Sequence, residues 1–229
     1  MYTKTYPDSI LPVMRSDYEF SDQWTVEQIC SVIQCFGARK TWDESFEEGQ
    51  VIERYSQKEY LIHIKMKSLF PIQRRDFSIL TSIESNISSG AVYIASTSVQ
   101  DNLIPVSESS VRASYVSYGW ALIPQKNNTI LVTMIAHLNM AGTTPLPSSI
   151  VRKLMVILPS SLAKIKRYLD QVGCPPYIRR VAGKITREEF ENKQYSMTFI
   201  AKHTPSRRSH SSWCTDLRVH ESIYPHGFQ

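Results

Sequence analysis

The chain has 229 residues, of which 42% are hydrophobic and 21% charged, and its formal net charge is +5 at neutral pH. These ordinary proportions exclude a wholly disordered chain and a collagen-like repeat. The charge is uneven, because residues 1–170 hold 17 basic against 16 acidic side chains and residues 171–229 hold nine against five. This basic tail fits an anionic membrane surface at least as well as a nucleic acid, and a merely solvated tail is an equal alternative.

The N-terminal part predicts an extended segment followed by a helix. Residues 1–20 show rough alternation of polar and apolar side chains and no helical period. Thr25, with Gln28 three residues later, forms the pattern of a capping box, which predicts that a helix begins just after Thr25. Gly37 is expected to end this helix.

Six predicted strands follow between residues 50 and 139. They are 51–55, 60–66, 76–83, 91–99, 111–123 and 129–139. Polar and turn-forming residues separate them, and the connections are short. Strands joined by short turns pair in the antiparallel sense, so we expect an antiparallel meander.

A long helix is predicted at 148–170, where apolar side chains form a wide stripe. Pro159 lies inside this stripe and predicts a kink or a one-turn break. Lys164, Lys166 and Arg167 are expected on the opposite, solvated face. Because helix, antiparallel meander and long helix follow one another, the fold class is α+β. A strongly curved sheet with an amphipathic helix across its mouth would enclose a space.

Several sequence pieces, in a fixed order, carry a family resemblance. They are RKTWD at 39–43, VIE at 51–53, MKSLFPIQRRDF at 66–77, SVQDNLIP at 98–105, VRASYVSYGWALIP at 111–124 and VTMIAHLNMAGTTPLPSSIVRKL at 132–154. Together they resemble the StAR-related lipid transfer (START) domain over about residues 2–169. The resemblance implies a helix-grip fold, in which a U-shaped sheet grips a C-terminal helix over a tunnel for one lipid.

The resemblance also divides the chain. It places a lipid-binding domain at residues 1–172. Family members usually have an additional N-terminal helix before it, and either that helix is absent or the chain is a fragment. Residues 173–229 lie beyond the usual end of the family and form a basic extension, with a predicted strand at 194–203. Its last part, 213–228, is similar to the opening of a further β unit, so we expect an incomplete β module.

Arg39 and Asp43 form the strongest polar pair. The resemblance implies that they meet the lipid head group, and an arginine fork suits a phosphate. The alternative is an ion pair that only stabilises the fold. Choline recognition needs aromatic faces around a quaternary ammonium, but the corresponding positions are Ile64 and Phe77. Because one aromatic residue is lost there, phosphocholine is not favoured.

Sterol-binding relatives carry a buried acid–arginine pair at positions that match Ile62 and Thr81. Neither residue is charged, so this chain lacks that pair. An apolar tunnel that holds a sterol by shape, or acyl chains, is therefore expected, and a filled core is the alternative. The expected wall consists of Ile62, Ile64, Met66, Phe77, Ile79 and Thr81, with Trp120, which is favoured as a core residue. The expected roof consists of Ile150, Leu154, Ile157 and Leu158.

Two further pairs have predicted roles. Arg75 and Asp76 match the RDF motif of the family, and we interpret them as a structural ion pair that braces the preceding turn. Leu103 and Ile104 lie in the loop 101–110, which the resemblance places at the tunnel mouth as part of the gate. They either dip into a membrane or pack under the C-terminal helix, and the sequence favours neither alternative.

Signatures of catalysis are missing from the sequence. It has no G-x-S-x-G elbow, no glycine-rich phosphate loop and no spacing typical of a metal site, so we expect no enzyme activity, no metal and no cofactor. The hypothesis is a monomeric carrier that moves one sterol or phospholipid between membranes. Helix 148–170 and loop 101–110 form its gate. The alternative is a lipid-sensing or interaction module of a larger protein.

The compartment follows from the cysteines and from the apolar runs. Four cysteines without a signal peptide indicate free thiols in a reducing compartment. No run approaches the roughly 18 apolar residues of a spanning helix. The predicted location is therefore cytoplasmic, with transient contact to an anionic membrane surface and no nucleic-acid partner.

Overall fold

The computed structural model describes all residues except 8, 22, 57, 69, 71–72, 142–145, 203–213, 222 and 228–229. The strands are β1 (Tyr2–Lys4), β2 (Val13–Phe20), β3 (Phe46–Arg54), β4 (Glu59–Met66), β5 (Arg75–Ser85), β6 (Val92–Ser98), β7 (Val111–Arg112), β8 (Ser114–Pro124), β9 (Ile130–Asn139), β10 (Tyr177–Arg180), β11 (Lys184–Glu191), β12 (Ser196–Lys202) and β13 (Asp216–Arg218). The helices are α1 (Val26–Gln34), α2 (Phe36–Trp42), α3 (Ser148–Ile157) and α4 (Ser161–Val172).

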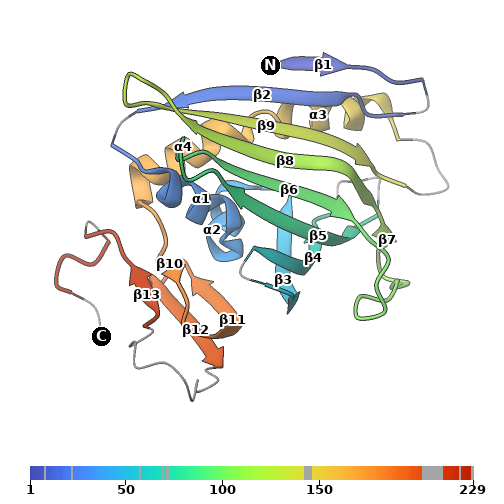
Figure 1. The fold of residues 1–229 in the computed structure, drawn as a ribbon. Coiled ribbons are helices and arrows are strands. Elements are labelled where there is room, and N and C mark those ends of the chain that lie inside the picture. Colours follow the sequence, from blue (N-terminus) through green and yellow to red (C-terminus); the bar gives the residue numbers. More distant parts are fainter. Residues whose placement is uncertain are drawn as a thin grey trace.

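One curved sheet dominates the fold. Its strand order is β1-β2-β9-β8-β6-β5-β4-β3, and all neighbours along this path are antiparallel. The short strand β7 pairs in parallel with the start of β5. In Figure 1 the sheet turns so strongly that β3 lies across the direction of β2, while α1, α2 and α4 gather beneath one end. The predicted α+β helix-grip fold is confirmed.

The predicted capping box is also confirmed. The Thr25 hydroxyl accepts from the Gln28 backbone, and the Gln28 side chain accepts from the Thr25 backbone. The predicted end of the helix is wrong, because α1 already ends at Gln34 and Gly37 lies inside α2. Cys35, in extended conformation, separates the two helices.

The C-terminal helix is broken where the proline predicted it. α3 and α4 are separated by Leu158, Pro159 and Ser160. The Ser16 hydroxyl on β2 donates a buried hydrogen bond of 3.0 Å to the Pro159 carbonyl oxygen, which fixes the break to the sheet. α3 buries only Ile150 and Leu154, whereas α4 buries Leu162, Ile165, Tyr168 and Leu169.

The interior has two apolar clusters. One joins α1, α2 and α4 to β8 and β9, and it contains Trp42, Trp120 and Ile165. The other joins β3, β4 and β5 to α3 and contains Ile64 and Leu154. Tyr118 and Leu158 pack against both clusters. The sheet therefore has two differently covered ends, and the α3–α4 break lies where they meet.

The C-terminal extension forms two small sheets, β10–β13 and β11–β12. The predicted strand at 194–203 corresponds to β12, and β13 lies within the β unit expected at 213–228, while β10 and β11 were not predicted. Phe190 on β11 is buried in the core, and Arg54 on β3 forms an ion pair of 2.9 Å with Glu188. A Cβ atom on Gly37 would overlap the Phe190 carbonyl oxygen, so glycine permits the close approach of α2 and β11. Part of this extension, 203–213, lies outside the described residues.

Candidate functional site

A buried ion pair marks the last turn of α2. Arg39 Nε donates to Asp43 Oδ2 at 3.0 Å, and the two side chains are only 10% and 11% exposed. The guanidinium also lies over the Phe46 ring, 4.7 Å from its centroid. An ion pair this deeply buried is costly to desolvate, so it indicates a specific local role.

The charges of this pair stabilise each other. Burial alone would raise the pKa of Asp43, but attraction to Arg39 and hydrogen bonds from Ser45 and Arg39 hold that pKa below its ordinary value. Burial would likewise lower the pKa of Arg39, and attraction to Asp43 reverses the direction. Both groups are therefore charged at neutral pH.

Two tyrosines share the surroundings of this arginine. Burial raises the pKa of both Tyr115 and Tyr118, and attraction to Arg39 opposes each rise. The two rings stack on each other, with centroids 4.6 Å apart. The guanidinium is therefore enclosed by aromatic rings and neutral hydroxyls, together with one carboxylate.

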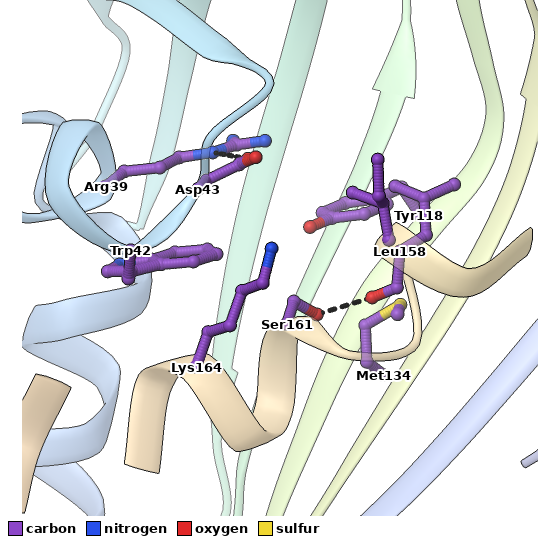
Figure 2. Close-up of a pocket in the computed structure, with 9 residues that line it drawn as sticks. Arg39, Trp42, Asp43, Tyr118, Met134, Leu158, Ser161 and Lys164 are labelled. Atoms are coloured by element: carbon purple, nitrogen blue, oxygen red, sulfur yellow. Dashed lines mark hydrogen bonds and ion pairs between the residues drawn. The ribbon is translucent and has the colours of Figure 1, made fainter. Parts of the chain in front are cut away.

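A cleft opens beside the ion pair at the α3–α4 break (Figure 2). Its polar members are Arg39, Asp43, Ser161 and Lys164, and its apolar walls are Trp42, Tyr118, Met134, Ile157 and Leu158. The cavity volume is about 10 Å³, which is room for about one water molecule. The cleft joins an apolar wall to a charged end.

Lys164 is the residue of the cleft that sequence reasoning misplaced. It was expected on the solvated face, but Figure 2 shows its side chain reaching from α4 toward the space below the Arg39–Asp43 pair. The buried stripe of α4 is the predicted one, since Leu162, Ile165 and Leu169 are buried. Lys164 lies at the edge of this stripe, three residues after the cleft residue Ser161, where a long lysine side chain reaches the cleft.

The predicted wall residues are mostly packed rather than open. The buried set consists of Ile62, Ile64, Phe77, Ile79, Thr81, Trp120, Ile150 and Leu154, and the half-buried set consists of Met66, Ile157 and Leu158. Among them, only Ile157 and Leu158 line the cleft. The Thr81 hydroxyl is hydrogen bonded to the Ser96 hydroxyl at 2.9 Å. The structure thus places most of these residues in the apolar interior.

The predicted Arg75–Asp76 ion pair is wrong. Successive residues of a strand point to opposite faces, so the two side chains diverge. Arg75 donates to the carbonyl oxygens of Gln73, Met140 and Ala141. Arg75 therefore braces the loop after β9 instead of pairing with its neighbour.

Asp76 is the centre of a separate network on the other face. It accepts from Arg112 at 2.8 Å, from His63 at 2.9 Å and from Ser110 at 3.0 Å. Arg112 also donates to the carbonyl oxygens of Ile104 and Pro105. Asp76 thus holds the loop 101–110 to β5 through Arg112.

The two apolar residues of that loop differ in exposure. Leu103 is 57% exposed, whereas Ile104 is 3% exposed. Each of the two alternatives for this loop, membrane contact and internal packing, therefore fits one of the two residues. Leu103 has the exposure that membrane contact needs, and Ile104 packs inside.

A wider hollow of about 300 Å³ lies on the opposite face of β4 and β5, where Leu61 alternates with the inward-facing Ile62. Two carboxylates, of Glu59 and Asp101, lie at its rim together with Tyr55. It shares no residue with the cleft.

The described residues contain neither a membrane-spanning helix nor a cluster of metal ligands. No helix among them is long and apolar enough to cross a membrane. Within the same residues, no three His, Cys, Asp or Glu side chains gather as ligands of a metal ion.

The sequence of the chain matches a known protein family. A family model described as "START domain" matches residues 10–163. Among curated proteins, no sequence matches the chain significantly.

Solved structures give a consistent picture of the fold. Human STARD10 is 21% identical with a TM-score of 0.62, and the match covers 71% of this chain and 64% of that chain. Human StAR-related lipid transfer protein 5 is 19% identical with a TM-score of 0.62, covering 70% and 76%. A STAR-related lipid transfer protein from Xanthomonas axonopodis is 18% identical with a TM-score of 0.60, covering 74% and 92%. The chain thus spans less than two thirds of the STARD10 chain, and at these identities the likeness shows the fold.

Proposed function

The chain belongs to the START domain family, and from this premise we propose that it binds one lipid molecule, without covalent chemistry, and carries it between membranes. The observation that carries the proposal is the cleft at the α3–α4 break, where an apolar wall meets the buried Arg39–Asp43 pair. The acyl chains or rings of a lipid need an apolar surface, and its head group needs polar partners. In this cleft the apolar wall and the polar side chains lie next to each other.

Lipid entry requires one wall of the cleft to move. Sites for small organic ligands have volumes of roughly 300 Å³ or more, and the cleft offers about 10 Å³. α3 is the wall with the least burial, since only Ile150 and Leu154 are buried, and the Ser16–Pro159 hydrogen bond fixes its end. The proposed gate is therefore α3, with α4 as a fixed support, and not the whole segment 148–170.

A membrane surface favours opening of this gate. Lifting α3 exposes apolar side chains, at a cost of roughly 25 cal/mol per Å² in water, and a bilayer offsets that cost. The outward side of α3 carries the exposed residues Arg152, Lys153 and Val156, a combination that suits an anionic surface. Leu103 adds an exposed apolar side chain on the loop 101–110.

A second candidate function is lipid sensing, and the position of α2 favours it. This helix carries Arg39 at the cleft and Gly37 at the contact with Phe190 of the extension. A ligand that shifts Arg39 would therefore act on a helix that also touches β11. In that case the ligand alters the extension and its partners, and bulk transfer is not the role.

Native mass spectrometry with organic extraction of the purified chain tests lipid binding. The expected result is one intact lipid per chain, recovered with unchanged mass. A chemically altered lipid would indicate catalysis instead, and a chain that loads no lipid from any vesicle would refute the proposal.

Transfer between donor and acceptor vesicles then separates the two candidates. A carrier accelerates lipid movement between them. A sensor loads lipid, transfers it slowly, and changes the rate at which a protease cuts its extension when loaded.

A further inference from the structure

Lys164 has a weak partner at the cleft. Its Nζ lies 3.4 Å from Glu44 Oε1, and the Glu44 side chain is 81% exposed whereas that of Lys164 is 22% exposed. Ion pairs with such an exposed partner contribute little stability. Lys164 can therefore exchange Glu44 for another anion at low cost, while its stem remains against the wall of the cleft.

Arg39 retains unused hydrogen-bond donors on the same cleft. An arginine has five N–H donors, and the bond to Asp43 uses the one on Nε. The Tyr115 hydroxyl is a second hydrogen-bond partner of the guanidinium, so the remaining N–H groups of the two terminal nitrogens are left for a ligand. Donors held in a planar fork match the oxygen atoms of a phosphate.

Asp43 does not offer a matching acceptor to a ligand. Its Oδ1 accepts from both the backbone and the hydroxyl of Ser45, and its Oδ2 accepts from Arg39. Three of the roughly four acceptor positions of the carboxylate are thus occupied by neighbours, and Arg39 balances its charge. The remaining charge facing the cleft is the positive charge of Lys164.

We propose that the cleft selects a lipid whose head group is a phosphate with net negative charge, held between Arg39 and Lys164, over a zwitterionic phosphocholine lipid. This inference rests on the proposed function and names the class of lipid. A phosphocholine would bring a quaternary ammonium close to the Lys164 ammonium, and like charges at that range repel. A phosphate monoester instead supplies acceptors to both cationic groups.

The test measures lipid taken into the chain from vesicles of phosphatidylcholine with and without phosphatidic acid. The chain is separated from the vesicles before the bound lipid is extracted and quantified, so that adhesion of the basic tail is not counted. We expect phosphatidic acid to be enriched in the bound fraction. In Lys164→Gln that enrichment falls about tenfold, the size of one charge-assisted hydrogen bond, and Lys164→Arg restores it.

Lys166→Gln is the matched control. Lys166 lies on the same helix and forms an ion pair with Asp170 away from the cleft. Removing its charge changes the net charge equally, so loss of enrichment in both variants would indicate general electrostatics and overturn the inference. Equal loading of both lipids by the native chain would also overturn it, while leaving the proposed function intact.

Inorganic phosphate separates the two sources of the anion. A chain that binds phosphate in a Lys164-dependent manner but loads neither lipid would refute both the lipid inference and the proposed function. Competition of phosphate with phosphatidic acid, together with lipid loading, would support the head-group site.

Discussion

Arg39 on α2 donates to Asp43 at 3.0 Å in a site where both side chains are nine-tenths buried. Neither charge can be deleted alone without leaving the other unpaired in the interior. The pair is therefore a condition of local folding as well as a candidate ligand contact. Any experiment on ligand binding at this site must separate the two effects.

A double-mutant cycle on this pair is the first prediction. We expect Arg39→Ala to lower the free energy of unfolding by about 3–5 kcal/mol, because it strands the Asp43 carboxylate. Adding Asp43→Ala should recover part of that loss. Denaturant unfolding of the single and double variants measures both values, and purely additive losses would show that the two residues are uncoupled.

Binding at this site is better probed with Arg39→Lys, which retains the charge and loses the fork. We expect the free energy of unfolding to fall by less than it does in Arg39→Ala, because a charge that balances Asp43 remains, and the loading of phosphate-bearing lipids to weaken. Unchanged loading would remove the guanidinium from the head-group site.

The third prediction concerns the loop 101–110. Leu103→Asp should reduce sedimentation of the chain with anionic vesicles and change its stability by less than about 0.5 kcal/mol. Ile104→Ala should instead cost about 2–5 kcal/mol, because Ile104 is buried. Ile87→Asp is the control, since Ile87 is 99% exposed on another turn. Equal effects of Leu103→Asp and Ile87→Asp would exclude a special role of this loop in membrane contact.

The pH dependence of stability is the fourth prediction. Burial would raise the pKa of Asp76, but hydrogen bonds from Arg112 and His63 hold it below the ordinary value of 3.8. Because the pKa is lower in the folded state, the stabilisation is present above that ordinary value and is lost as the pH falls below it. Asp76→Asn should therefore cost about 2–3 kcal/mol at neutral pH, and this difference should shrink progressively as the pH falls from the ordinary pKa through the lowered one. A pH-independent difference between native chain and variant would contradict this.

Docking of the C-terminal extension is the fifth prediction. Gly37→Ala places a Cβ atom against the Phe190 carbonyl oxygen, which is backbone and cannot rotate away. We expect β11 to separate from α2, and protease cleavage between residues 173 and 200 to become faster. Gly227→Ala, where no atom lies nearby but φ is positive, controls for the loss of a glycine. An unchanged cleavage rate in Gly37→Ala would mean that the contact does not hold the extension.

Local chemistry made the main elements predictable from the sequence. The Thr25–Gln28 box and the ring of Pro159 each act within four residues, and both predictions are confirmed. Strand alternation likewise predicted the strands of the main sheet to within a few residues, apart from the short β1 and β7. The prediction that Gly37 ends the first helix was wrong. Its conformational freedom suggested a helix end, but glycine is needed there for close packing against Phe190.

Long-range partners were beyond this reasoning. Asp76 is held by Arg112, 36 residues later, and not by its neighbour Arg75. A pattern of charges along the chain cannot distinguish these partners, because register and sheet curvature decide which side chains meet. Lys164 was misplaced for a related reason, since the cleft that it reaches is completed by Arg39 and Trp42 of the distant helix α2, which helical periodicity does not reveal. Whether Arg39 and Asp43 contact a lipid stays a prediction.

The break at Pro159 affects the equilibrium population of an open form. If α3 lifts alone, the fully buried side chains that become exposed are those of Ile150 and Leu154, at roughly 1.5–3 kcal/mol each, and the half-buried Val151 adds to this cost. An open form at about 3 kcal/mol or more would make up at most about one molecule in 10² in water. An unbroken helix would have to raise Leu162, Ile165 and Leu169 as well, and its open fraction would be negligible. For the proposed carrier, the proline break would therefore set how large the open fraction is in water, while α4 stays in the core.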